Sequence, residues 1–278
     1  MAPLLMFLNL LITLFLAKPT FSLNDFQERI LYGEDVKIED YPFYAALRIE
    51  YEEPRGMVGT CGAAIISDIW ILTAAHCVSG QHSNEIGYVY VGGESFDNSL
   101  QVSYNKVIVH ENYQLLNLLT EFKIYVLPIH DIALIRLESP LTFSDKVQPI
   151  NLPMYPMSDT NVKVIGRGRD ETGSATIYLK KVDLIRLTTQ ECLSSNFPAM
   201  QNYAQLNMNL LEASTTCAKR KGDLPSICYG DSGGPLFNGN TLVGLASYLG
   251  NKTCETTRVA FYVNVASYVP WIMNNIRP

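Results

Sequence analysis

The 278-residue sequence contains few charged residues, at 17%, and has no long run of lysine and arginine. Binding to nucleic acid depends on such clusters to neutralise phosphates, so we expect no nucleic-acid partner. The sequence also lacks internal repeats and linkers rich in glycine, serine or proline. Hydrophobic residues make up 47% of it, which is enough for a sizeable core. These features indicate one large folded domain or two small ones.

Motifs for metal binding are missing too, because the sequence contains neither C-x-x-C nor H-E-x-x-H. No acidic loop resembles a strong calcium site, and we expect no metal and no cofactor. The six cysteines are therefore interpreted as disulfide-bonded, as is usual in an oxidising compartment. They are Cys61, Cys77, Cys192, Cys217, Cys228 and Cys254. The sequence by itself leaves about 15 pairings open.

The N-terminus carries the one long hydrophobic run, over residues 4–16. This run is too short to cross a bilayer, which takes roughly 20 residues, but it suits the core of a secretory signal. Small residues predict a signal peptide over residues 1–22, with Ala17 as an alternative cleavage site and an uncleaved anchor as the competing interpretation. We therefore expect a secreted, extracellular protein without a membrane domain.

Short runs rich in valine, isoleucine, tyrosine and threonine follow one another between residues 30 and 265, and turn residues interrupt them. Such runs predict strands, and many strands joined by turns predict an all-β sandwich or barrel. Residues 111–131 fit this rhythm poorly, because they are long for a loop and largely apolar. We expect either a structured insertion or an interaction surface there.

The C-terminal stretch VASYVPWIMNNIRP follows a helical period. Val265, Val269, Ile272 and Ile276 fall on one face, which predicts a short helix that docks on the strands. Pro270 suits the first turn of a helix, so the helix is predicted to begin near that residue.

The stretch YGDSGGPLF surrounds Ser232 with glycines. It is either an ordinary turn or a site in which a nucleophilic serine needs bare backbone N–H groups. A serine hydroxyl needs a base to become nucleophilic. His82 is interpreted as a loop residue, His110 as structural and His130 as either. His76 stands at the end of the apolar strand in ILTAAHCV, beside a cysteine, which makes it the best candidate for the base.

A catalytic histidine must in turn be oriented by a carboxylate. Asp131 heads the apolar run DIALIRL, where packing does not favour an acid. The motifs TAAHC, DIALIRL and GDSGGP, in this order, resemble those of the chymotrypsin/trypsin-like serine endopeptidases from residue 30 to the C-terminus. The resemblance implies two antiparallel six-stranded β-barrels with the active site in the cleft between them. It also implies that His76 is the base, Asp131 its partner and Ser232 the nucleophile, with the N–H groups of Gly230 and Ser232 as oxyanion hole.

The resemblance further implies an inactive precursor. After loss of the signal peptide, a trypsin-like protease would remove a short activation peptide, residues 23–29, by cutting between Arg29 and Ile30, which leaves a protease domain over residues 30–278. The new amine of Ile30 would then form a buried ion pair with Asp231. The start ILYG departs from the usual IVGG of the family.

The disulfides implied by the resemblance are Cys61–Cys77, Cys192–Cys217 and Cys228–Cys254. The specificity pocket would be formed by Ser226, Ser247, Tyr248, Leu249, Gly250 and Ala260, with Ser226 at its base and Ser247 bonded near Asp131. An uncharged base disfavours cleavage after arginine or lysine, so we expect preference for apolar or medium-sized residues. Chymotrypsin-like and elastase-like preferences both stay open, and the first is favoured. Asn251 starts a glycosylation sequon at the pocket rim.

A catalytically impaired homologue that binds other proteins is the alternative function. An esterase of the α/β-hydrolase type is excluded, because it would need G-x-S-x-G and the order Ser, Asp, His. The expected partners are protein or peptide substrates, an activating trypsin-like protease and protein inhibitors, and the expected state is a monomer.

Overall fold

The computed structural model describes residues 33–50, 58–80, 86–119, 124–155, 160–169, 178–194, 209–222, 226–250 and 253–277. Several predicted features lie outside these residues. They are the signal peptide over 1–22, the activation peptide over 23–29 with Arg29 and Ile30, the loop residue His82, and Asn251.

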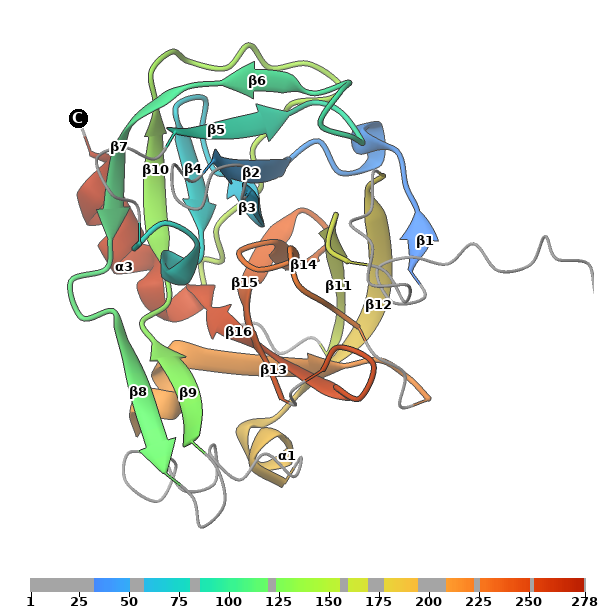
Figure 1. Ribbon diagram of the computed structural model, residues 1–278, viewed down its shortest axis with the longest axis vertical. Coiled ribbons are helices and arrows are strands. Elements are labelled where there is room, and N and C mark those ends of the chain that lie inside the picture. The colour runs from blue at the N-terminus through green and yellow to red at the C-terminus, as the bar shows by residue number, and fades with distance from the viewer. Residues whose placement is uncertain are drawn as a thin grey trace, which may run out of the picture.

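The first half of the chain forms an antiparallel sheet with the order β6-β5-β2-β3-β4-β10-β7. The bounds are β2 Tyr44–Glu50, β3 Val58–Ile65, β4 Trp70–Thr73, β5 Ile86–Val91, β6 Leu100–Val102, β7 Tyr104–Val109 and β10 Ala133–Leu137. The two outermost strands, β6 and β7, are separated in the chain only by Ser103. The sheet must therefore curl round on itself, with β6 and β7 as one bent strand (Figure 1). Small and branched side chains such as Ala63, Ile71, Val89 and Ile135 fill its interior.

The second half forms a closed barrel in the order β12-β11-β14-β15-β16-β13, completed by pairing between β12 and β13. Its strands are β11 Asn161–Gly166, β12 Lys180–Leu187, β13 Thr215–Lys219, β14 Pro235–Asn238, β15 Thr241–Leu249 and β16 Val259–Asn264. The short strand β1, Glu34–Asp35, pairs with β12 at the outside. Figure 1 shows this barrel below the first sheet. The all-β fold with two barrels is thus confirmed.

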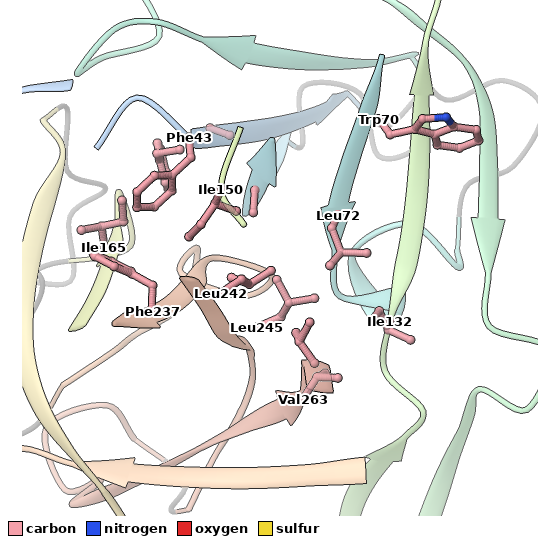
Figure 2. Packing of buried hydrophobic residues seen from close by; sticks show 14 of the residues in the cluster. Phe43, Trp70, Leu72, Ile132, Ile150, Ile165, Phe237, Leu242, Leu245 and Val263 are labelled. Carbon is pink, nitrogen blue, oxygen red and sulfur yellow. The ribbon is translucent and has the colours of Figure 1, made fainter. Parts of the chain in front are cut away.

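The two barrels share one hydrophobic core. Figure 2 shows side chains from both halves facing one another, with Phe43 and Leu72 from the first half of the chain and Phe237 and Leu245 from the second. All four side chains are buried. Burial of large apolar side chains is the main favourable term in folding. This shared core fixes how the ends of β4, β10 and β14 are placed relative to one another.

The C-terminal helix α3 spans Val265–Ile276, so it begins five residues before Pro270. The predicted start near Pro270 was therefore wrong. Val265, Tyr268 and Ile272 are the buried residues of α3 and join the core between the barrels. Packing of this face holds the first turns in place although Pro270 cannot donate a backbone hydrogen bond. Further short helices are the 3-10 turns η1 Ile38–Asp40 and η2 Ala75–Cys77, and α1 Thr189–Ser194.

The apolar segment between β7 and β10 forms a two-stranded hairpin, β8 Gln114–Leu119 and β9 Ile124–Ile129. In Figure 1 this hairpin extends beside the second barrel. Leu116, Leu127 and Ile129 pack in one cluster with Phe261 of β16, whereas Leu115 and Val126 are exposed. The segment is thus a structured insertion. Within the described residues, no helix is both long and apolar enough to span a membrane.

Candidate active site

Three loops bring the predicted catalytic residues to the junction of the barrels. His76 lies in η2, which follows β4 directly, and the disulfide Cys61–Cys77 ties this turn to β3. Asp131 lies between β9 and β10, and Ser232 in the turn before β14. These positions explain how residues distant in sequence can converge.

Asp131 accepts three hydrogen bonds that fix its carboxylate. The backbone N–H of His76 donates to Oδ1 at 2.8 Å, and Nδ1 of the same ring lies 2.8 Å from Oδ2. The hydroxyl of Ser247 donates to Oδ2 at 2.5 Å. A carboxylate at this distance places the ring proton on Nδ1, which leaves Nε2 free to act as a base.

The electrostatics of this pair suit general-base chemistry. Burial opposes ionisation of Asp131, but the charge of His76 and the bonds from His76 and Ser247 lower the pKa of Asp131 below its ordinary value. Burial likewise opposes protonation of His76, but the charge and hydrogen bond of Asp131 raise the pKa of the imidazole. The ring is thus a stronger base than an isolated histidine.

Ser232 and His76 line the same pocket, which has a volume of about 400 Å³. Its lining consists of His76, Ile227, Cys228, Tyr229, Ser232, Ser247, Tyr248 and Leu249. Among the described residues, no hydrogen bond joins Ser232 to the ring, and Nε2 lies 3.8 Å from Sγ of Cys77. Catalytic hydrogen bonds are commonly long or poorly aligned until a substrate is bound.

The turn before Ser232 presents free backbone donors. Gly230 has a φ of +97°, a conformation that side chains disfavour. The carbonyl oxygen of Tyr229 accepts a hydrogen bond from the N–H of Arg169 at 2.8 Å, which fixes the peptide before Gly230. Within the described chain, the N–H groups of Gly230 and Ser232 donate to no backbone oxygen. They are therefore available to bind an oxyanion.

Asp231 is fully buried beside this turn. Its carboxylate accepts hydrogen bonds from the N–H of Gly168 at 2.8 Å and of Cys228 at 2.9 Å. A Cβ atom at Gly166 or Gly168 would lie 2.1 or 2.4 Å from its oxygens, so only glycine fits at either position. Burial raises the pKa of Asp231 to about 7, against the opposing effect of the two backbone bonds. No cationic side chain among the described residues contributes to this pKa or neutralises the carboxylate.

The residues predicted for the specificity pocket are distributed unevenly. Ser247, Tyr248 and Leu249 line the pocket that holds Ser232, whereas Ser226 and Ala260 are fully buried. Leu249 pairs with Ala260 across β15 and β16 and packs against the disulfide Cys228–Cys254.

Tyr248 contributes an aromatic ring to the pocket lining. Tyr248 stacks on Phe261 at 4.7 Å between ring centroids. Gly250 donates its N–H to the carbonyl oxygen of Val259 at 3.1 Å, beyond the end of β15. Leu249 lines the pocket, whereas Gly250 is not among its lining residues.

The remaining disulfide, Cys192–Cys217, connects α1 to β13 under the hairpin. Within the described residues, the cluster with metal-ligand geometry consists of Cys61, His76 and Cys77, and both sulfurs of that cluster are bonded to each other. A disulfide sulfur is no thiolate, so this cluster is unsuited to hold a metal.

Several residues that shape the site could not be recognised from the sequence. Ile227 and Tyr229 belong to no motif, because each lines the pocket through its position in a loop. The two glycines at 166 and 168 surround a buried acid, and their spacing in GRG was the signal that could have revealed this contact.

Comparisons with known proteins agree with this geometry. The family model described as Trypsin matches residues 30–272. CLIP domain-containing serine protease B4 of Anopheles gambiae is 31% identical over 277 residues, covering 90% of this chain and 71% of that protein. The clotting factor G beta subunit of Tachypleus tridentatus is 31% identical over 227 residues, covering 76% of this chain and 69% of that subunit. The solved structure of HL collagenase matches with a TM-score of 0.69 and 25% identity, covering 88% of this chain and 97% of that one.

Fold and site together define a serine peptidase with the two-barrel fold of chymotrypsin. The chain belongs to the trypsin family of serine proteases.

Proposed function

We propose that the protein is a secreted serine endopeptidase in which Ser232 is the nucleophile, His76 the general base and Asp131 the residue that orients His76. The observation that carries this proposal is the hydrogen-bonded pair of His76 and Asp131, which opens on the pocket that Ser232 lines. Ser232 Oγ attacks the peptide carbonyl as His76 Nε2 takes its proton. His76 then returns the proton to the leaving amine, and water hydrolyses the acyl-enzyme by the same steps in reverse.

The negative charge on the substrate oxygen would be stabilised by the N–H groups of Gly230 and Ser232. Loss of one donor in such a site costs on the order of 3 kcal/mol in the transition state. The fixed peptide between Tyr229 and Gly230 supports this role, because donors that are already oriented need no reorganisation during the reaction.

The preferred residue on the acyl side of the cut bond is small or medium-sized and apolar. Ile227, Cys228 and Leu249 give the pocket apolar walls, and its lining contains no lysine, arginine, aspartate or glutamate among the described residues. Leu249 lines the pocket and packs beside Ala260, so its side chain would narrow the pocket for a large aromatic residue. This favours the elastase-like preference over the chymotrypsin-like one.

The protein would be made as an inactive precursor and activated by a trypsin-like protease that cuts between Arg29 and Ile30. The buried carboxylate of Asp231, which has no cationic partner among the described residues, supports this proposal, because it provides a place for a new ammonium group. Such an ion pair would further stabilise the turn that carries Gly230. Loss of one partner of a buried ion pair costs roughly 3–5 kcal/mol, which is enough to separate an inactive from an active state.

Secretion is proposed from the hydrophobic N-terminus and the three disulfide bonds, which form in oxidising compartments. The proposed partners are protein or peptide substrates, the activating protease and protein inhibitors.

A peptide library tests this proposal. The precursor is cut with trypsin, its new N-terminus is sequenced, and the cleavage products of the library are identified. We expect an N-terminus at Ile30, cleavage after alanine, valine or similar residues, and no cleavage by Ser232→Ala. Strong preference for arginine or lysine would contradict the pocket assignment. Binding of peptides without hydrolysis would favour the impaired homologue.

A further inference from the structure

Two histidines near Asp131, His110 and His130, take no part in the proton transfer described above. His110 follows the end of β7, and His130 immediately precedes Asp131. Their rings are stacked, with centroids 4.7 Å apart and planes inclined by 6°. The N–H of His110 also donates to the carbonyl oxygen of Ile132 at 3.1 Å, so the same two segments are joined on both sides of Asp131.

The backbone of His130 is strained. Its φ is +51°, and it is the one residue other than glycine with a positive φ in the part of the chain that the structure describes. A branched or bulky residue in this conformation persists only where its surroundings impose it. Here the N–H of Ile132 donates to the carbonyl oxygen of His130 at 2.8 Å, which restrains the backbone. The side chain of His130 is restrained separately, by a residue of the C-terminal helix.

The C-terminal helix α3 contacts the side chain of His130. Nδ1 of His130 lies 2.9 Å from the hydroxyl of Tyr268, which is buried in α3. The ring of Tyr268 meets both imidazoles edge-on, at 5.4 and 5.9 Å between centroids. Trp271, one helical turn further, lies 5.0 Å from the ring of His110 and donates its Nε1 proton to Glu111 at 2.8 Å.

The imidazole of His110 is unprotonated at Nδ1 in this arrangement. The N–H of Asn112 donates to Nδ1 of His110 at 3.2 Å, which requires a lone pair there. Burial lowers the pKa of both imidazoles, and the pKa of His130 is lowered further because the two stacked rings would repel each other if both were protonated. The charged and titratable groups that face the pair are Glu111 beside β7, Asp131 in the next position of the chain, and Tyr268 on α3. Glu111 opposes both shifts of pKa without reversing them.

We propose that His130 is a positioning residue for the pair of Asp131 and His76. Its stacking on His110 and its bond to Tyr268 hold the peptide before Asp131 in a strained conformation that aims the carboxylate at His76. This inference rests on the proposed role of Asp131 in catalysis.

The consequence of removing these contacts follows from the geometry. The carboxylate of Asp131 makes three bonds at 2.5 to 2.8 Å, to the backbone and ring of His76 and to Ser247. Release of His130 would let its φ relax to a negative value, which rotates the adjoining peptide and displaces the carboxylate. A displacement of about 1 Å can reduce a rate by about a hundredfold.

The test uses His130→Ala, His130→Asn and Tyr268→Phe in the activated enzyme. We expect His130→Ala to lower kcat by about ten- to a hundredfold with KM unchanged. The acid limb of the kcat/KM profile should move to lower pH, because a displaced carboxylate raises the pKa of His76 less. His130→Asn should recover part of the rate, since asparagine tolerates a positive φ. A merely structural role would lower the Tm without moving the acid limb.

Ile272→Val is the matched control, because Ile272 is buried on α3 in the core between the barrels and is not part of the histidine cluster. It should lower the Tm and leave the acid limb in place. An unchanged kcat and acid limb in His130→Ala would overturn the proposal. If His130→Ala does not fold, Tyr268→Phe decides: a shifted limb supports the proposal and an unshifted one contradicts it. Failure of the wild-type enzyme to hydrolyse peptides would instead refute the proposed function.

Discussion

At the residue scale, Asp131 combines full burial with a low pKa, and the reason is visible in its partners. Three donors from His76 and Ser247 compensate for the loss of water around the carboxylate. The charge is therefore retained inside the protein, where it acts on the imidazole through a low-dielectric environment. The same bonds select the tautomer of His76 that leaves Nε2 free.

Asp131→Asn tests this role. The amide can donate a hydrogen bond to Nδ1, which favours the tautomer with its proton on Nε2 and removes the base. We expect kcat to fall by about 10⁴-fold while the Tm changes little. Steady-state hydrolysis of a peptide substrate measures the first quantity and thermal unfolding the second. A loss of less than tenfold in the folded variant would contradict the assignment of Asp131.

Leu249→Gly tests the pocket. Removal of this side chain from beside Ala260 should admit larger residues, so the ratio of kcat/KM for phenylalanine over alanine substrates should rise by about 10- to 200-fold. Paired peptides that differ at that one residue provide the measurement. Leu115→Gly is the control, because Leu115 is exposed on the hairpin and does not line the pocket. An unchanged ratio in Leu249→Gly would mean that another residue limits the pocket.

At the element scale, only one face of the hairpin β8–β9 packs against the rest of the described structure. Leu127 and Ile129 are fully buried against the second barrel, whereas Leu115 and Val126 on the other face are exposed. The sequence could not distinguish these faces, because the segment is apolar on both. It did predict the strands of the barrels, since there apolar residues are interrupted by turn signals. It missed the start of α3, because packing of Val265 outweighs the local preference of proline.

Leu127→Ala should therefore destabilise the protein by about 2–5 kcal/mol, since it leaves a cavity between hairpin and barrel. Denaturant unfolding gives the free energy. The matched substitution Leu115→Ala, on the exposed face of the same hairpin, should stay within about 0.5 kcal/mol of wild type. Equal effects of the two substitutions would show that the hairpin does not pack as described.

At the scale of the whole molecule, the two barrels contribute separate parts of one site. His76 and Asp131 come from the first barrel, and Ser232 from the second, so the core between the barrels determines their relative positions. Sequence motifs singled out all three residues as candidates, because each stands in a distinctive local context. The stack of His110 on His130 depends on folding, and local sequence carried no signal for it, whereas the spacing of Gly166 and Gly168 could have revealed their contact with Asp231.

The buried charge of Asp231 predicts how the uncut precursor responds to pH. Its pKa is raised to about 7 by burial, from an ordinary value of 3.8. The folded precursor therefore holds this proton where the unfolded chain has lost it, so the contribution of Asp231 to stability falls as pH rises between about 4 and 7. Unfolding free energies of wild type and Asp231→Asn across this range measure the effect. The difference between them should change in favour of the variant as pH rises, and a constant difference would contradict the account.

The rate at which a fluorophosphonate labels Ser232 tests the central claim most directly, because this reaction needs the activated serine and no particular side-chain preference. In the activated enzyme, peptide mapping should locate the adduct on Ser232. The rate should rise with pH along a single titration whose midpoint lies above 6.5, the ordinary pKa of histidine, as the charge of Asp131 requires. His76→Ala should abolish the labelling. An adduct on another residue, or labelling of Ser232 that persists without His76, would contradict the account.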